Sequence, residues 1–185
     1  MEPLEIVAQA VGIVAMVFNI LSYQGKKQST VITLQLFGAS LFAINFFMLG
    51  ATVGGIMNLM AAFRAIVFVN KKRFKAESVW WLIIFITMFV TAYVLTFTVF
   101  GKTFTLINAL IELLPIIAMT VSTIGFRNGS AKAIRYWGLI GSPSWLIYNI
   151  FNFAIGAIIC EVVSLISIVI GIIRYDIKKK IGVFL

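Results

Sequence analysis

The chain has 185 residues, of which 62% are hydrophobic and 11% are charged, and its mean hydropathy is +1.08. A soluble domain of this size needs more polar surface than this composition supplies, so these values exclude a soluble globular protein and predict an integral membrane protein. The chain has no histidine and a single cysteine, Cys160. An intrachain disulfide is therefore excluded, and we expect no metal site of the usual nitrogen and sulfur type and no cofactor.

Seven apolar segments are long enough to cross a membrane, because a transmembrane helix needs about 20 predominantly apolar residues. They cover residues 5–23, 31–50, 52–70, 79–100, 103–125, 135–153 and 155–173. The second and third segments are joined by a tight, uncharged junction, and so are the sixth and seventh. The sequence therefore predicts an all-α membrane protein with seven transmembrane helices.

The net charge of +9 is distributed unevenly over the predicted topology. Thirteen of the fifteen basic residues fall on one side, whereas Lys102 is alone on the other and Arg64 lies within the third span. The thirteen are Lys26, Lys27, Lys71, Lys72, Arg73, Lys75, Arg127, Lys132, Arg135, Arg174, Lys178, Lys179 and Lys180. The positive-inside rule then predicts an external N-terminus and a cytoplasmic C-terminus. This placement accounts for the basic charge without a nucleic-acid partner.

The chain contains an internal repeat at an offset of 103 residues. Over residues 4–75 the spans, the tight junction and the basic loops coincide with their later counterparts without a gap, and Asn58 aligns with Glu161. Three helices reverse the direction of the chain and a fourth restores it, so the two triplets should run parallel. We expect a 3+1+3 arrangement with a first triple-helix bundle over 1–75, a linker helix over 76–102, and a second bundle with a basic tail over 103–185.

The sixth predicted span carries polar side chains on one face. Ser142, Trp145, Asn149 and Asn152 are spaced at i, i+3, i+7 and i+10, which places them on one side of a helix. Lipid offers such side chains no partner, so a polar stripe on a membrane helix faces the bundle interior or a water-filled cavity. We expect the other helices to enclose this face.

Two short motifs resemble those of known transporter families. Ser-Tyr-Gln-Gly-Lys-Lys at residues 22–27 resembles the PQ-loop signature, with Ser-Tyr-Gln where that family has Pro-Gln. Trp-Leu-Ile-Tyr-Asn at residues 145–149 is similar to the Trp-x-x-Tyr or Trp-x-x-x-Asn motif of SWEET-like and PnuC-like vitamin transporters. Over nearly its full length the chain most resembles the YgjV-type bacterial inner-membrane proteins, which we place near the PQ-loop/SWEET superfamily. The resemblance implies a multi-pass transporter of the bacterial inner membrane.

The same resemblance implies roles for individual residues. Asn58 matches the third-helix asparagine that lines the SWEET substrate site, although the corresponding seventh-helix residue is Glu161 instead of asparagine. Of the four hinge prolines of SWEETs, two have counterparts here. The implied gating residues are Tyr23, Gln24, Pro115 and Pro143.

Three charged side chains lie inside predicted spans, away from the span ends. A charge at the bilayer centre costs about 2.5–3.5 kcal/mol, so Glu112 and Glu161 should be paired, protonated or facing water. They would form a solute or proton site, or else structural hydrogen bonds between helices worth about 0.6 kcal/mol each. Arg64 would either extend its side chain to the membrane interface or pair with one of these glutamates.

The first two spans also have polar faces. On the first, the shared face holds Gln9, Gly12, Met16, Asn19 and Tyr23. On the second, it holds Gln35, Gly38, Phe42 and Asn45. These residues either line a cavity or provide small-residue packing and polar contacts between helices.

Taken together, the sequence predicts a transporter of a small polar solute, such as a sugar, vitamin, nucleoside or amino-acid-like molecule. It would work by alternating access between two bundles in the lipid bilayer, with protons as a coupling ion. The predicted substrate site comprises Asn58, Glu112, Trp145, Tyr148, Asn149 and Glu161. The alternative is a receptor or assembly factor of the same fold that does not transport. An enzyme is not expected, because no set of nucleophile, base and orienting group is present.

Overall fold

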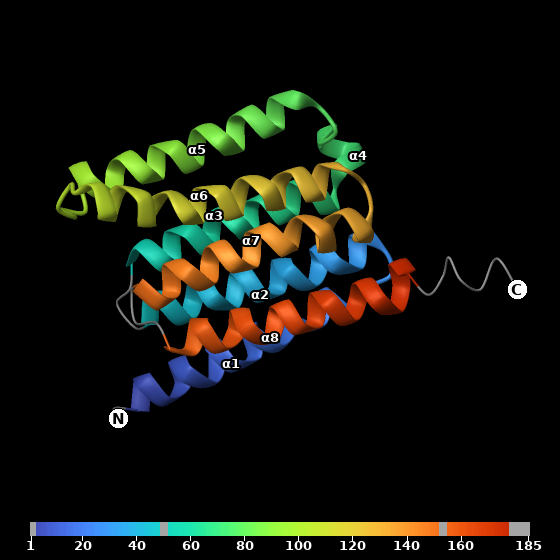
Figure 1. Cartoon of the computed structure of the whole chain (residues 1–185), viewed down its shortest axis with the longest axis horizontal. Helices are drawn as coiled ribbons and strands as arrows, with labels where there is room; N and C mark the ends of the chain where they lie inside the picture. Colours follow the sequence, from blue (N-terminus) through green and yellow to red (C-terminus); the bar gives the residue numbers. More distant parts are fainter. Residues whose placement is uncertain (1–2, 49–51, 152–154, 178–185) are drawn as a thin grey trace, which may run out of the picture.

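The computed structural model describes residues 3–48, 52–151 and 155–177, and these are helical with no strand (Figure 1). The helices are α1 (Pro3–Ser22), α2 (Gln28–Met48), α3 (Thr52–Val69), α4 (Lys71–Phe74), α5 (Val79–Thr98), α6 (Leu106–Arg127), α7 (Ala131–Phe151) and α8 (Ile155–Gly171), followed by the π-helical segment η1 (Ile172–Ile177). The predicted all-α fold is confirmed for the described residues.

Five of the described helices are long and apolar enough to cross a membrane. They are Leu4–Ser22, Gln28–Met48, Val79–Thr98, Leu106–Arg127 and Gly156–Ile177. The described apolar part of α3, Gly55–Val69, is shorter. Helix α7 is not among the five, because it contains Lys132 and Arg135 as well as serines and an asparagine, and these lower its hydropathy.

The long helices pack side by side as two groups of three, with α5 at one edge (Figure 1). Helix α2 packs along both α1 and α3, and α7 packs along both α6 and α8. We call α1–α3 the N-terminal half and α6–α8 the C-terminal half. The halves meet through α1 with α8, α2 with α7, and α3 with α6. Helices α1, α3, α6 and α8 run in one direction and α2, α5 and α7 in the other.

The two halves contain equivalent helix crossings. Helices α2 and α7 both have 21 residues, and their first residues, Gln28 and Ala131, are 103 positions apart. A Cβ atom built on Gly38 would lie 3.2 Å from the carbonyl oxygen of Ala15, and one built on Gly141 would lie 3.5 Å from that of Ala118. These two pairs are also related by the offset of 103. A side chain at position 38 would crowd the facing backbone, whereas one at position 141 would be in ordinary van der Waals contact with it.

Basic side chains gather at one end of the helices. The α1–α2 turn, α4, the α6–α7 turn and η1 all lie at this end, which we call the basic end, and the α5–α6 turn with Lys102 lies at the other (Figure 1). The segregation of charge follows the prediction for the described residues. Lys178, Lys179 and Lys180 lie outside them.

Arg135 differs from the prediction that it belongs to a loop. Helix α7 begins at Ala131 instead of near residue 135, because the Ser130 hydroxyl accepts a hydrogen bond of 3.0 Å from the backbone N–H of Ala133 in the first turn. Arg135 therefore lies inside the helix. Its side chain is only 2% exposed and forms an ion pair with Asp176 of η1.

An aromatic cluster attaches α5 to both halves near the basic end. The fully buried Phe85 contacts the rings of Trp81, Phe89, Phe63 and Phe68 at centroid distances between 5.8 and 6.3 Å. Phe68 of α3 also meets Phe126 of α6 edge-on at 5.8 Å. In lipid, such packing holds helices together, since transfer out of water no longer drives their association.

Candidate functional site

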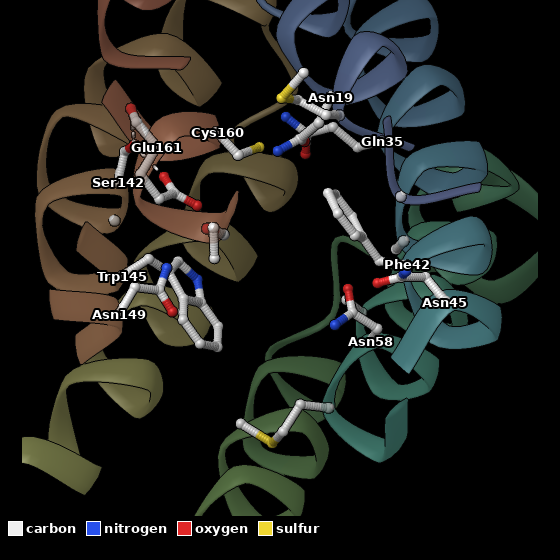
Figure 2. A pocket seen from close by; sticks show the side chains of 18 of the residues that line it. Asn19, Gln35, Phe42, Asn45, Asn58, Ser142, Trp145, Asn149, Cys160 and Glu161 are labelled. Carbon is white, nitrogen blue, oxygen red and sulfur yellow. Dashed lines mark hydrogen bonds between the residues drawn. The ribbon is translucent and has the colours of Figure 1, made fainter. Parts of the chain in front are cut away.

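A cavity of about 540 Å³ lies between the two halves. Its lining residues come from α1, α2, α3, α6, α7 and α8, together with Tyr23 just after α1. Figure 2 shows amide side chains of the N-terminal half, among them Asn19 and Asn58, facing Trp145, Asn149 and Glu161 of the C-terminal half. The volume is within the range of about 300–1,000 Å³ that is usual for small-molecule sites.

The polar face of α7 points into this cavity, as its spacing predicts. Ser142, Trp145 and Asn149 all line it, whereas Asn152 lies outside the described residues. Tyr148, which was predicted to contact substrate, is not a lining residue. Its ring instead packs edge-on against the indole of Trp145 at a centroid distance of 5.8 Å, so it supports the position of that indole.

The polar faces of the first two spans also meet at the cavity. Of the nine residues on these faces, eight line it: Gln9, Gly12, Met16, Asn19, Tyr23, Gln35, Phe42 and Asn45. The exception is Gly38, which packs against α1. Asn45 also has a structural role, since its Nδ2 donates a hydrogen bond of 2.7 Å to the carbonyl oxygen of Ala8. From the sequence, these residues could either line a cavity or pack between helices. In the structure most of them line the cavity.

The two intramembrane carboxylates lie in different environments. Glu161 lines the cavity, where its Oε2 accepts a hydrogen bond from the hydroxyl of Ser142. It is the one acidic residue of the lining among the described residues. Glu112 was expected in the same site but is not a lining residue. The α5–α6 turn brings Lys102 against it, and this ion pair offsets the cost of burying the carboxylate.

Arg64 follows neither of the two predicted alternatives. It is 5% exposed, so it does not extend to the membrane interface, and none of the three ion pairs among the described residues includes it. Its Nη1 donates to the carbonyl oxygen of Met119 at 2.8 Å and to Oγ1 of Thr123 at 3.2 Å. The guanidinium carbon lies 4.8 Å from the centre of the Phe126 ring. Helix α6 therefore holds one edge of the guanidinium.

The two predicted hinge prolines lie within continuous helices, Pro115 in α6 and Pro143 in α7. Neither lines the cavity. Their role in gating stays a prediction.

The predicted gating residue Gln24 connects the two halves at the basic end. Its Nε2 donates to the carbonyl oxygen of Ser167 at 2.7 Å and to the Ser167 hydroxyl at 2.9 Å. That hydroxyl in turn donates to the carbonyl oxygen of Ile20 at 2.8 Å. The end of α1 is therefore joined to α8.

Arg135 makes a second connection beside the first. Its Nε and Nη2 donate to the two carboxylate oxygens of Asp176 at 2.9 and 2.6 Å. Its Nη1 donates to the carbonyl oxygens of Gly25 at 2.9 Å and Tyr23 at 3.3 Å. A Cβ atom on Gly171 would lie 2.6 Å from the Tyr23 carbonyl oxygen, so only glycine allows α8 this close. We call Gln24, Arg135, Ser167 and Asp176 the basic-end network.

Three members of this network were not singled out from the sequence: Arg135, Ser167 and Asp176. One signal was present, because Asp176 is the only aspartate in the chain and stands within a strongly basic segment. An isolated acid among basic residues is a candidate for a specific ion pair. The sequence does not reveal which of the neighbouring cations it meets.

Breaking the ion pair of the network should strongly destabilise the protein. Arg135→Ala leaves the Asp176 carboxylate buried without its partner, which typically costs about 3–5 kcal/mol. We expect a clearly lower Tm for the purified protein in detergent, with partial recovery in Arg135→Lys, which keeps the charge but loses the bidentate geometry. Lys132→Ala changes an exposed cation on the first turn of the same helix and serves as control. Equal Tm values for Arg135→Ala and Lys132→Ala would contradict a stabilising pair.

The family relationship agrees with this description of a helical membrane protein. Residues 6–179 match the family model Imp-YgjV, described as bacterial inner membrane protein. No curated protein and no solved structure matches the chain. The expected relation to the PQ-loop and SWEET families stays a prediction. Since the matched region covers most of the 185 residues, the chain belongs to the Imp-YgjV family of bacterial inner membrane proteins.

Proposed function

We propose that this protein transports a small polar solute across the inner membrane by alternating access between its N-terminal and C-terminal halves. The observation that carries the proposal is the cavity of about 540 Å³ between the halves, with amides on one side and an indole, an amide and a carboxylate on the other. Polar groups at such a position in a membrane protein are costly unless they face water or a solute.

The proposal includes seven spans in a 3+1+3 arrangement. In this proposal α3 and α7 also cross the membrane, which together with the five apolar helices makes seven spans. Helix α7 is more polar than the five because it contains Lys132 and Arg135 and because Ser142 and Asn149 face the cavity. The equivalent crossings at Gly38 and Gly141 support two related bundles, and α5 is the linker between them. We place the basic end in the cytoplasm and the N-terminus outside.

In this mechanism the described conformation is the one closed at the basic end. Tyr23 lines the cavity at that end, and the basic-end network lies directly beyond it. Opening toward the cytoplasm then requires Gln24 to leave Ser167 and Arg135 to leave the carbonyl oxygens of the α1–α2 turn. Pro115 and Pro143 are the hinges, since each removes one backbone hydrogen bond from its helix.

The topology can be tested by labelling engineered cysteines in a Cys160→Ala background. We expect a cysteine at Lys102 to react with an impermeant thiol reagent in spheroplasts, because the α5–α6 turn faces outward. A cysteine at Lys72 in α4 should react only after the membrane is permeabilised. The reverse pattern would place the basic end outside and refute the orientation.

Transport itself is tested with purified protein in proteoliposomes. A thermal-shift screen of sugars, amino acids, vitamins and nucleosides selects the solute, because a bound ligand raises Tm by mass action. We expect uptake of this labelled solute to fall at least about tenfold in Trp145→Ala, since an interaction of 1.4 kcal/mol corresponds to that factor. Trp80→Ala removes a tryptophan that is 68% exposed and distant from the cavity lining, and it should leave uptake unchanged. Binding without uptake would favour the receptor alternative.

Coupling to protons should depend on Glu161. Its carboxylate lies in the cavity beside Ser142, and the other titratable lining residues, Tyr23, Arg64 and Cys160, ordinarily titrate above pH 8. We expect wild-type uptake to change between pH 5 and 8 and Glu161→Gln to be insensitive to pH over this range, because the amide keeps the shape but does not titrate. If Glu161→Gln shows the same pH profile as the wild type, proton coupling does not depend on Glu161. Glu112→Gln is the control carboxylate outside the lining.

A further inference from the structure

Arg64 brings an uncompensated positive charge to the cavity. Its side chain is buried and lines the cavity, and its hydrogen bonds to the described residues are all made by Nη1. The Nε atom is buried and has no hydrogen-bond partner among the described residues. The contacts at Nη1 are to neutral groups on α6. The positive charge therefore has hydrogen-bonding capacity left over, and no carboxylate among the described residues pairs with it.

Glu161 is the complementary case in the same cavity. Its carboxylate accepts from the Ser142 hydroxyl, and no described cation forms an ion pair with it (Figure 2). Arg64 belongs to α3 in the N-terminal half and Glu161 to α8 in the C-terminal half. Among the described lining residues there are thus one cation and one carboxylate, on opposite halves, and the two do not pair with each other.

The charge of the solute follows from this pair. A neutral solute would leave both ionised groups unpaired in a low-dielectric site, where an unpaired charge costs several kcal/mol. An anion would satisfy Arg64 but place negative charge near Glu161, and a cation would do the reverse. A solute with one charge of each sign satisfies both groups.

We propose that the transported solute is a small zwitterion of the amino-acid class, whose carboxylate pairs with Arg64 and whose ammonium group pairs with Glu161. This inference rests on the proposed transport function and specifies its substrate class. The solute would bridge the two halves, because each charged group of the protein belongs to a different half. Trp145, held by Tyr148, would contact the solute's side chain.

The first test compares probes that differ only in charge. The purified protein is titrated with the twenty L-amino acids by calorimetry. Each one that binds is compared with its amide, which lacks the negative charge, and with its des-amino acid, which lacks the positive charge. We expect the zwitterion to bind at least about 30-fold more tightly than either analogue, the factor for losing one buried charge pair worth about 2 kcal/mol. Tighter binding of either analogue would overturn the proposal.

The second test uses single-residue variants, each of which should lose one of the two binding preferences and keep the other. Arg64→Gln should lose the preference for the amino acid over its amide but keep the preference over the des-amino acid, whereas Glu161→Gln should do the opposite. Arg64→Lys keeps the charge and should keep both preferences. Size-exclusion profiles report folding, and Glu161→Gln tests the inference independently if Arg64→Gln fails to fold. Unchanged preferences in Glu161→Gln, or in a folded Arg64→Gln, would refute the pairing.

The outcomes separate the substrate class from the transport function. If no amino acid binds at millimolar concentration while a sugar or nucleoside is taken up, the zwitterion is wrong and transport stands. If an amino acid binds with the expected preferences but is not taken up into proteoliposomes, the substrate class is supported as that of a receptor, and transport is wrong.

Discussion

The burial of polar groups among helices in lipid is the constraint on which this structure depends. Lipid offers no hydrogen-bonding partner, so each buried polar group must be satisfied by the chain, by water or by a ligand. Arg135 finds Asp176, and Glu112 finds Lys102. Arg64 and Glu161 are satisfied only in part, and both lie at the cavity. Among the described residues, two buried side-chain atoms have no hydrogen-bond partner: Arg64 Nε, at the candidate site, and Ser164 Oγ, which does not line the cavity.

The described helices pack as two groups of three that meet at the cavity. Gly38 lies where α2 crosses α1 and Gly141 lies where α7 crosses α6, and the two groups face each other across the cavity. A cavity at such a boundary is surrounded by two bodies that are internally well packed. Relative motion of the halves would change access to the cavity without disturbing the packing inside either half, which suits alternating access better than a rigid binding site does.

The spacing of polar residues along a helix was enough to predict which side chains face the cavity. The spacing of Ser142, Trp145 and Asn149 predicted a face that lines the cavity, and the polar face beginning at Gln9 behaves likewise. Helical periodicity is enough for such predictions, because it determines which side chains share a face. Glu112 shows the limit. Its position in the helix resembled that of a cavity residue, but Lys102, in the turn just before this helix, is its partner.

By itself, the sequence determined that this is a helical membrane protein with basic residues segregated to one end, since composition, helix length and charge placement are local properties. The repeat at an offset of 103 residues stays a prediction. Only the tertiary structure decided which helix faces line the cavity together, that Arg135 pairs with Asp176, and that no described carboxylate pairs with Arg64. The physical reason is that ion pairing and cavity lining depend on contacts between helices distant in sequence. Such contacts are set by the packing of all the helices together, and no single periodicity encodes them.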